Sequence, residues 1–397
     1  MKQIDMSQFD NIQQEQVKQG LEEGLDVSWY AKPEFEWRQM KEIRLGLEQG
    51  LDISVYAKPE FDDDQMCQIR LGLEQGLDVG VYAKPEFDSH KMFVLRNGIS
   101  KGLDVSICAN SRFNACQTST IVFKGLEKGI DIGEYADPKF DEFQLKQIIL
   151  GFRKRARVDV SVYAKPEFNA GQMEQIRLGL RKKIDITPYY STKYDGFQMK
   201  QLRKGIEQGL DISKYANPKF NGWQMKQIKL GLEEGLDVGV YAKPEFNDGE
   251  MEQIRIGLEK GVDVSSYANK DFNQRQLYEI KEGLVSNVDV NVYANTKYDN
   301  NQMFWIRSGL EDGLDVSVYA DTKFSSGQMC QIKKGLEKGV DVSVYAKPEF
   351  DFEQMDAIRL GLEEGIDVSV YAKPELTFSQ MYYKKRELTK DLYKERG

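Results

Sequence analysis

Residues able to do chemistry are scarce in this 397-residue chain. It holds one histidine, His90, and four cysteines, Cys67, Cys108, Cys116 and Cys330. A Ser-His-Asp triad would need that single imidazole, and a metal site built from several histidines is excluded. The cysteines form neither a C-x-x-C pair nor a disulfide framework, so we expect free thiols and no metal. We also find no phosphate-binding glycine loop and no H-E-x-x-H or G-x-S-x-G motif, and we therefore expect no cofactor and no enzymatic activity.

Aspartate is the other residue type that could bind a ligand, because its carboxylate recurs along the whole chain. It follows a Gly-Leu/Ile/Val unit at Asp26, Asp52, Asp78, Asp104, Asp131, Asp159, Asp185, Asp211, Asp237, Asp263, Asp289, Asp315, Asp341 and Asp367. The gaps are 26 residues except for 27 and 28 between Asp104 and Asp159. Packed helices lie about 8–10 Å apart, so these carboxylates are too distant from one another to share a Ca²⁺ ion. We expect them to cap short helices instead.

One repeat reads F-D-x-x-Q-M-x-Q-I-R-L-G-L-E-x-G-L-D-V-S-V-Y-A-K-P-E. Met66, Ile69 and Leu73 are spaced by three and four residues, which predicts a helix of about 13 residues in each repeat. Asp62 suits its N-cap, and Gly76 suits a left-handed position at its end. The next segment, 77–83, predicts a short α or 3₁₀ turn capped by Asp78, although its alternation is also compatible with a strand.

A 26-residue unit cannot bury its apolar face alone, so the copies must stack. We predict an all-α, superhelical solenoid of about 14 tandem repeats. Residues 1–13 would form an N-terminal cap, residues 14–378 the solenoid, irregular at 104–159, and residues 379–397 a capping helix with a basic tail. Glycines recur in mid-helix at Gly46, Gly72, Gly179 and Gly231, which predicts that neighbouring backbones approach too closely for a Cβ.

The repeat resembles two groups of known proteins. Y-A-K-P-E-F-x-x-x-Q-M-x-x-I-R-L-G-L-E, which covers nearly the whole chain, is similar to uncharacterised repeat proteins of Firmicutes and their mobile elements. Gly335–Val342 resembles the helix-to-turn segment of an ankyrin repeat, and the architecture resembles ankyrin, HEAT and leucine-rich-variant solenoids. The ankyrin T-P-L-H signature is absent and the period is not 33, so the likeness implies a helical solenoid and no particular activity.

Equivalent positions of the aligned repeats are called columns here. A column whose residue differs between copies is not needed for stacking and is free to contact a partner. Counted from the turn aromatic that opens each unit (Phe35, Phe61, Phe87, Tyr194), they lie two, three and six residues later, with a looser one at ten. Large aromatics and Arg recur there, and these residue types anchor protein interfaces, although some could pack on a neighbouring unit. The candidate partner-binding residues are Trp37, Arg38, His90, Phe93, Phe143, Phe197, Trp223, Tyr278, Phe304, Trp305, Phe352 and Phe378.

Basic residues gather where the register breaks. The candidates for binding an anion or an acidic partner are Arg153, Lys154, Arg155, Arg157, Arg181, Lys182 and Lys183. Solvated cations that suit the helix dipole are an equal alternative. The preceding unit has Cys108 in the tyrosine column, and we expect Asn114–Thr118 to be shifted by one residue. These copies could form a kink or a dedicated site.

Net charge and hydrophobicity exclude some classes of protein. The net charge of −9 argues against a protein built mainly to bind nucleic acid. No apolar run approaches the ~18 residues of a membrane span, and MKQIDMSQFD lacks signal-peptide features, so we expect a cytoplasmic protein. We expect a protein-binding scaffold, such as an adaptor or an inhibitor that wraps its partner. The alternative is a modular nucleic-acid binder that uses the basic cluster near 153–183.

Overall fold

A computed structural model describes residues 4–154, 158–265, 267–269 and 271–395, of which 391–395 by their backbone alone. These residues form fifteen α-helices and short 3₁₀ turns without a strand, so the predicted all-α fold is confirmed. The α-helices are α1 (Asn11–Glu22), α2 (Trp37–Glu48), α3 (Asp63–Glu74), α4 (Ser89–Ser100), α5 (Ala115–Ser119), α6 (Glu142–Phe152), α7 (Ala170–Lys182), α8 (Gly196–Glu207), α9 (Gly222–Glu233), α10 (Asp248–Glu259), α11 (Gln274–Val285), α12 (Asn300–Glu311), α13 (Ser326–Glu337), α14 (Phe352–Glu363) and α15 (Phe378–Glu395).

The segment after most helices is a single 3₁₀ turn, which rules out the strand alternative. These turns are η2 (Val27–Trp29), η3 (Ile53–Val55), η4 (Val79–Val81), η7 (Gly133–Tyr135), η8 (Val160–Val162), η9 (Thr187–Tyr189), η10 (Ile212–Lys214), η11 (Val238–Val240), η12 (Val290–Val292), η13 (Val316–Val318), η14 (Val342–Val344) and η15 (Val368–Val370). Another turn, η1 (Met6–Gln8), precedes α1, and η6 (Leu126–Lys128) continues the helix that begins with α5.

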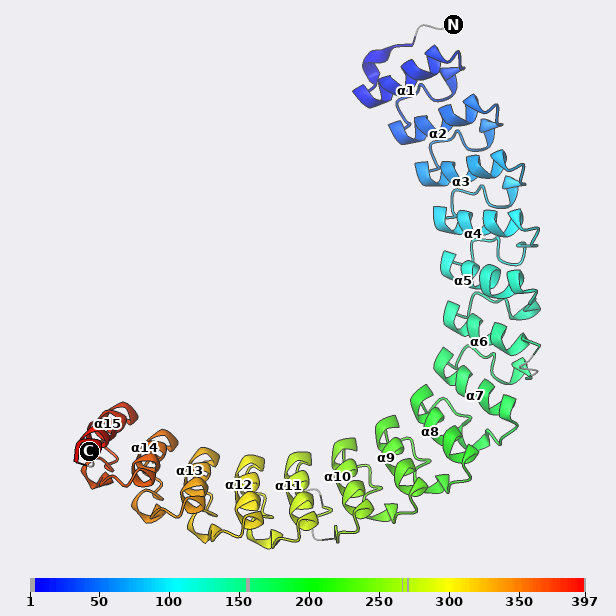
Figure 1. The fold of residues 1–397 in the computed structure, drawn as a ribbon. Helices are drawn as coiled ribbons and strands as arrows, with labels where there is room; N and C mark the ends of the chain where they lie inside the picture. Colours follow the sequence, from blue (N-terminus) through cyan, green and yellow to red (C-terminus); the bar gives the residue numbers. More distant parts are fainter. Residues whose placement is uncertain (1–3, 155–157, 266, 270, 396–397) are drawn as a thin grey trace. The chain divides into compact units, whose positions relative to one another are not determined.

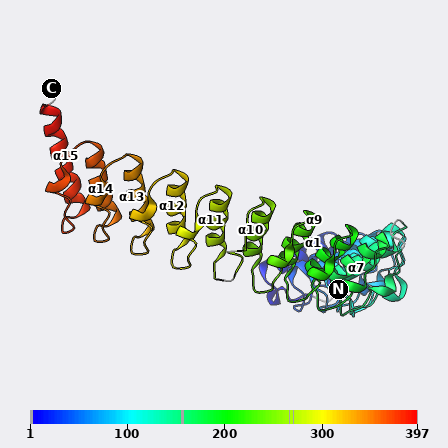
Figure 2. The same cartoon turned by 90° about the horizontal axis from the view of Figure 1, so that it is seen from below.

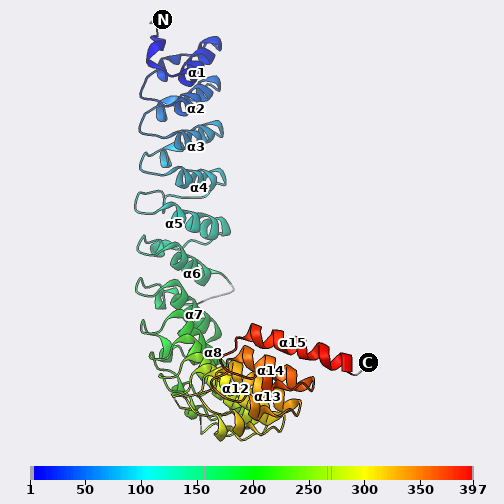
Figure 3. The same ribbon diagram turned by 90° about the vertical axis from the view of Figure 1, so that its left-hand side faces the viewer.

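The chain divides into two compact units, residues 1–203 and 204–397, and the division falls inside α8. In the first unit, consecutive helices from α1 to α7 lie side by side, with the turns along one side of the row (Figures 1 and 3). In the second unit, α9 to α15 form a similar row, and α15 extends beyond its neighbour α14 (Figures 1 and 2). Each helix packs on the next along the chain, as expected for a solenoid.

The ends of each unit are fixed by local capping. Asp62 accepts a hydrogen bond from the N3 backbone of α3, and Gln65 reciprocates in a capping box. Gly76 follows the helix with a φ of +67°, the left-handed conformation that its sequence position predicts. Asp78 accepts the backbone N–H of Gly80 and so caps η4. The predicted role of the recurring aspartate is therefore confirmed.

The mid-helix glycines make room for a tyrosine, and the predicted contact between neighbouring backbones is wrong. A Cβ on Gly72 would overlap the hydroxyl of Tyr82, ten residues later in the same unit. That hydroxyl donates to the carbonyl oxygen of Gln68 at 3.3 Å, while the ring is fully buried. The same arrangement recurs at Gly335, where the Tyr345 hydroxyl donates to the Gln331 carbonyl at 3.1 Å. In these units the tyrosine thus holds its 3₁₀ turn onto its own helix, whereas the buried Tyr267 hydroxyl makes no such bond.

A glutamine links each unit to the next. Gln302 accepts the Asp299 backbone N–H at 2.9 Å through its side-chain oxygen, and its side-chain nitrogen donates to the Phe324 carbonyl of the next turn at 2.7 Å. The carbonyl belongs to a buried turn aromatic, so the bond is shielded from water. Lys91 occupies this column in α4 and reaches the Phe113 carbonyl at 2.6 Å. A single side chain therefore caps one helix and fixes its neighbour.

A column of cations forms a second link between units. It lies nine residues after the turn aromatic, or after Leu376 in the last unit, and is named the cation column here; from α2 onward its members are Arg44, Arg70, Arg96, Arg177, Arg203, Lys229, Arg255, Lys281, Arg307, Lys333, Arg359 and Lys385. Arg359 donates from Nε to the Gln331 side-chain oxygen of the preceding helix at 3.0 Å. Arg70 reaches Glu42 in the same way at 2.9 Å. Val122 and Ile149 interrupt the column at the irregular repeats.

The two irregular spacings are accommodated differently. Asn114 caps α5 and Gln117 completes its capping box in the ordinary register, so the predicted shift over Asn114–Thr118 is wrong. The extra residue lies farther along, where the π-helical segment η5 (Thr120–Gly125) continues α5. In the next unit, the two extra residues follow α6, whose C-cap Arg153 is extended.

Candidate functional site

In residues 1–203, two predicted aromatics stand out from the helix surface. Phe143, three residues after its turn aromatic, is 61% exposed, and Phe93, at the sixth position, is 40% exposed. His90 is exposed beside Phe93, with ring centroids 6.3 Å apart. Arg38 is also exposed, while Trp37 is half-buried and lies 5.2 Å from the Arg38 guanidinium. The variable columns of this unit therefore present aromatic and cationic groups to solvent.

Residues 204–397 carry the larger set. Trp223 is 53% exposed, Phe352 50%, Tyr278 44% and Phe304 37%, each on a different helix. The exposed aromatics of the two units, Phe93, Phe143, Trp223, Tyr278, Phe304 and Phe352, are called the aromatic stripe below. The turn aromatics and the methionines of the constant columns are buried, whereas the members of the stripe lie at other helix positions and are exposed. Other units stack without an aromatic residue at these positions, so the exposed part of these side chains is available for another contact.

The remaining predicted aromatics are only half-buried and take part in packing. They are Trp37, Phe197, Trp305 and Phe378. Trp305 packs edge-on against Phe304 at 4.9 Å, and Phe378 lies 5.9 Å from Tyr382. Even within the stripe, Tyr278 and Phe304 lie over cation-column members, with Lys281 at 4.5 Å and Arg307 at 5.5 Å. The alternative of packing on the scaffold thus describes part of the predicted set.

The predicted basic cluster falls at the C-terminal ends of α6 and α7. Arg153, Lys154, Arg181, Lys182 and Lys183 are exposed, whereas Arg155 and Arg157 lie outside the described residues. Arg181 and Lys182 occupy the last turn of α7, where cations oppose the negative end of the helix dipole. Lys183 has a φ of +58° at a position that glycine occupies in most units. A side chain there is strained, since L-residues avoid this conformation.

Arg177 joins this cluster and was not among the predicted site residues. It is buried, only 7% exposed, and Arg153 and Arg181 are close enough to act on it electrostatically. Burial chiefly lowers the pKa of Arg177, and both neighbouring cations lower it further against the opposing effects of Tyr163 and Glu174. A comparison of columns could have found it. Most cation-column residues have a glutamate four residues later, and Arg177 has Arg181.

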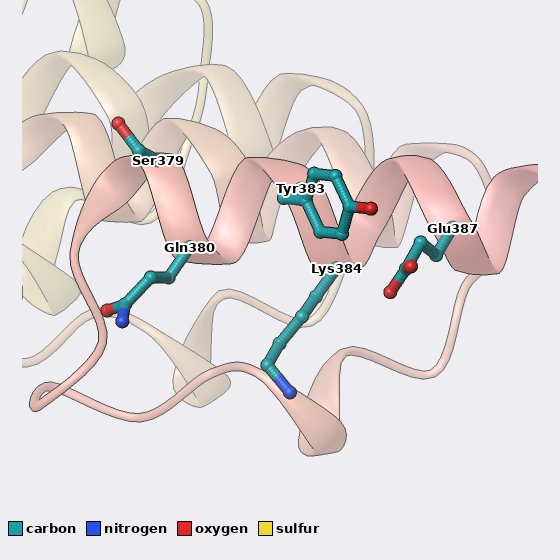
Figure 4. Close-up of a pocket in the computed structure, with 5 residues that line it drawn as sticks. All are labelled: Ser379, Gln380, Tyr383, Lys384 and Glu387. Atoms are coloured by element: carbon teal, nitrogen blue, oxygen red, sulfur yellow. The ribbon is translucent and has the colours of Figure 1, made fainter.

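One cavity lies beside helix α15. A cavity of about 420 Å³ is lined by Ser379, Gln380, Tyr383, Lys384 and Glu387 (Figure 4). Gln380 is in the linking glutamine column, and the same column is covered by the next unit wherever one follows, as Gln354 shows by donating to the Leu376 carbonyl at 2.7 Å. At the other end, Leu21, Leu25 and Val27 line an apolar cavity of about 730 Å³ with Ile4 and Met6.

Among the described residues, no group of three or more His, Cys, Asp and Glu side chains could hold a metal ion. All four cysteines are free. None of the helices in the described part of the chain has the length and apolar character needed to cross a membrane.

The fold and the exposed columns define a helical-repeat protein of the α-solenoid class. No protein-family model, curated protein or solved structure matches the chain.

Proposed function

We propose that this chain is a non-enzymatic, protein-binding repeat scaffold that serves as an adaptor or an inhibitor. The exposure of the aromatic stripe carries this proposal. Six large aromatic side chains, between 37% and 61% exposed, occupy solvent-facing helix positions where the repeat needs no apolar group. Aromatic residues are enriched at protein interfaces because they bury much area with few rotatable bonds. A cytoplasmic location and a protein partner are parts of the same proposal.

Comparing two tryptophans by co-purification tests the proposal. Trp223→Ala removes a 53% exposed side chain from the stripe, whereas Trp29→Ala removes a 38% exposed side chain from the turn η2. We expect the wild type and the Trp29→Ala variant to retain a stoichiometric protein partner from the native host, and Trp223→Ala with Phe352→Ala to lose it. Equal capture by the wild type and both variants would rule out the stripe as the binding surface.

Nucleic acid is the second candidate partner, favoured only by the basic cluster at α6 and α7. Phosphate contacts make binding fall steeply with salt. If single-stranded or duplex nucleic acid is the ligand, a gel shift should appear at low salt, weaken steeply as salt rises and disappear when Arg153 and Arg181 are changed. No shift at low salt would remove this candidate. The net charge of −9 opposes it.

A further inference from the structure

The cation column supplies a reference for what is unusual at Arg177. In most regular units its members pair with a glutamate one helical turn later; Arg96, Lys281 and Lys385 have Ser100, Val285 and Thr389 there. Arg307 Nη1 lies 2.6 Å from Glu311, and Lys229 Nζ lies 2.7 Å from Glu233. Arg255 forms the same pair with Glu259. The buried cation is therefore neutralised within its own unit, which offsets the cost of taking it out of water.

Arg177 lacks this neutralisation. The residue four positions later is Arg181, a second cation, and among the described residues no carboxylate lies within ion-pair distance of Arg177. Its hydrogen-bond partner is the neutral side-chain oxygen of Gln147, which accepts from Nε at 3.2 Å and from Nη2 at 3.0 Å. A guanidinium has five N–H donors, so donor capacity remains after these two bonds.

Glu174 on the same helix acts on Arg177 electrostatically but forms no ion pair with it, and two further cations lie nearby. Arg153 ends α6 and acts electrostatically on Arg177, as does Arg181. Lys183 extends the cluster from a left-handed position that glycine would adopt without strain. The chain as a whole is acidic, with a net charge of −9. The overall charge therefore does not explain why cations gather around this buried guanidinium.

We propose that Arg153, Arg177 and Arg181 bind a carboxylate side chain from an acidic segment of the protein partner. That carboxylate takes the place of the glutamate that other units supply from their own helix. A carboxylate is favoured over a phosphate because the equivalent position in Arg255 and Arg307 already holds a carboxylate against the same guanidinium. The inference rests on the proposed protein-binding function and adds the chemistry of one contact.

Charge reversal at Arg181 gives a test that does not depend on a damaged fold. Arg181→Glu restores the sequence pattern of the regular units, so the variant should fold at least as well as the wild type. Hexaglutamate is the probe, and its affinity is measured by fluorescence anisotropy at low ionic strength. We expect the wild type to bind it and Arg181→Glu to bind about tenfold more weakly or worse. Lys338→Glu, the same change on an exposed lysine after α13, is the control and should leave the affinity unchanged.

The outcomes separate the possibilities. Absence of hexaglutamate binding, or equal losses in Arg181→Glu and Lys338→Glu, would overturn the inference. Tighter binding of hexathymidylate than of hexaglutamate would overturn it in favour of a nucleic-acid phosphate. Should hexaglutamate fail while Trp223→Ala still abolishes capture of the partner, the carboxylate contact is wrong and the protein-binding function stands.

Discussion

At the residue scale, the buried tyrosine and the mid-helix glycine act as one device. Tyr345 is fully buried and donates to the Gln331 carbonyl, and the missing side chain of Gly335 leaves space for its hydroxyl. Burial raises the pKa of Tyr345 well above its usual range, so the hydroxyl stays protonated and remains a donor. A glycine that weakens an isolated helix is thus retained because it permits a buried hydrogen bond.

This pairing predicts strong coupling between the two residues. Gly335→Ala should destabilise the protein by about 1–3 kcal/mol because the new methyl group overlaps the Tyr345 hydroxyl. Tyr345→Phe should cost about 0.5–1.5 kcal/mol through the lost hydrogen bond. The double variant should cost less than the sum of the two, since the hydroxyl that clashes is gone. Urea unfolding of all four proteins measures the coupling, and strict additivity would refute this account.

Lys183 predicts a change of the opposite sign. Replacing it with glycine should stabilise the chain by about 1 kcal/mol, because the left-handed backbone no longer carries a Cβ. Gly235→Lys, at the equivalent position after α9, where φ is +70°, should destabilise by a similar amount. Thermal unfolding midpoints compare the pair. A loss of stability in Lys183→Gly would show that the lysine is held by contacts that outweigh the strain.

At the element scale, the linking glutamine sets the spacing of adjacent helices. Gln302→Leu should cost about 1–3 kcal/mol, because the buried Phe324 carbonyl and the Asp299 N–H would lose their partner. Gln302→Glu should destabilise the protein less at low pH than at neutral pH, because a protonated carboxyl can still donate a hydrogen bond to the Phe324 carbonyl. Glu250 shows that the acid can keep the capping half of the interaction, since it accepts the Asn247 N–H at 2.9 Å. Guanidinium unfolding at two pH values tests this order.

The aspartates that cap the 3₁₀ turns predict how these elements respond to acid. Hydrogen bonds from the Ser317 side chain and backbone hold the pKa of the Asp315 carboxyl below its ordinary value of 3.8. A lowered folded-state pKa contributes stability above pH 3.8, and that contribution is lost as the pH falls through the folded-state value. Ser317→Ala should raise the pKa of Asp315 and move acid unfolding to higher pH. NMR titration of the carboxyl carbon measures the first effect, and an unchanged pKa would contradict it.

How far the sequence predicts these elements depends on the range of the interaction. The caps at Asp62 and Asp78 are predictable because donor and acceptor lie two or three residues apart. The partner of Gly72 was not predicted, since Tyr82 meets it only after the chain has turned back. The π-helical segment at 120–125 was also missed, because one inserted residue could be absorbed anywhere between two caps. Arg177 was also missed, because it differs from most members of its column only in having Arg181 in place of a glutamate one helical turn later.

At the scale of the whole molecule, the described contacts between elements run between neighbours along the chain. Stability in such a solenoid is roughly a sum of unit and interface contributions, so the substitutions above should act locally and add when they fall in distant repeats. This architecture lets single units depart from the pattern at a local cost. The aromatic stripe and the basic cluster are departures of this kind, and of their members only Arg177 belongs to a column that links the repeats.

Hydroxyl-radical footprinting of the chain, alone and bound to its partner, tests the central claim most directly. Oxidation is followed at Phe143, Trp223, Tyr278 and Phe352 in the stripe and at Trp29 in the turn η2, all of which are exposed in the free chain. The account predicts that the partner protects several stripe residues and leaves Trp29 reactive. Protection of Trp29 with no change along the stripe would contradict it.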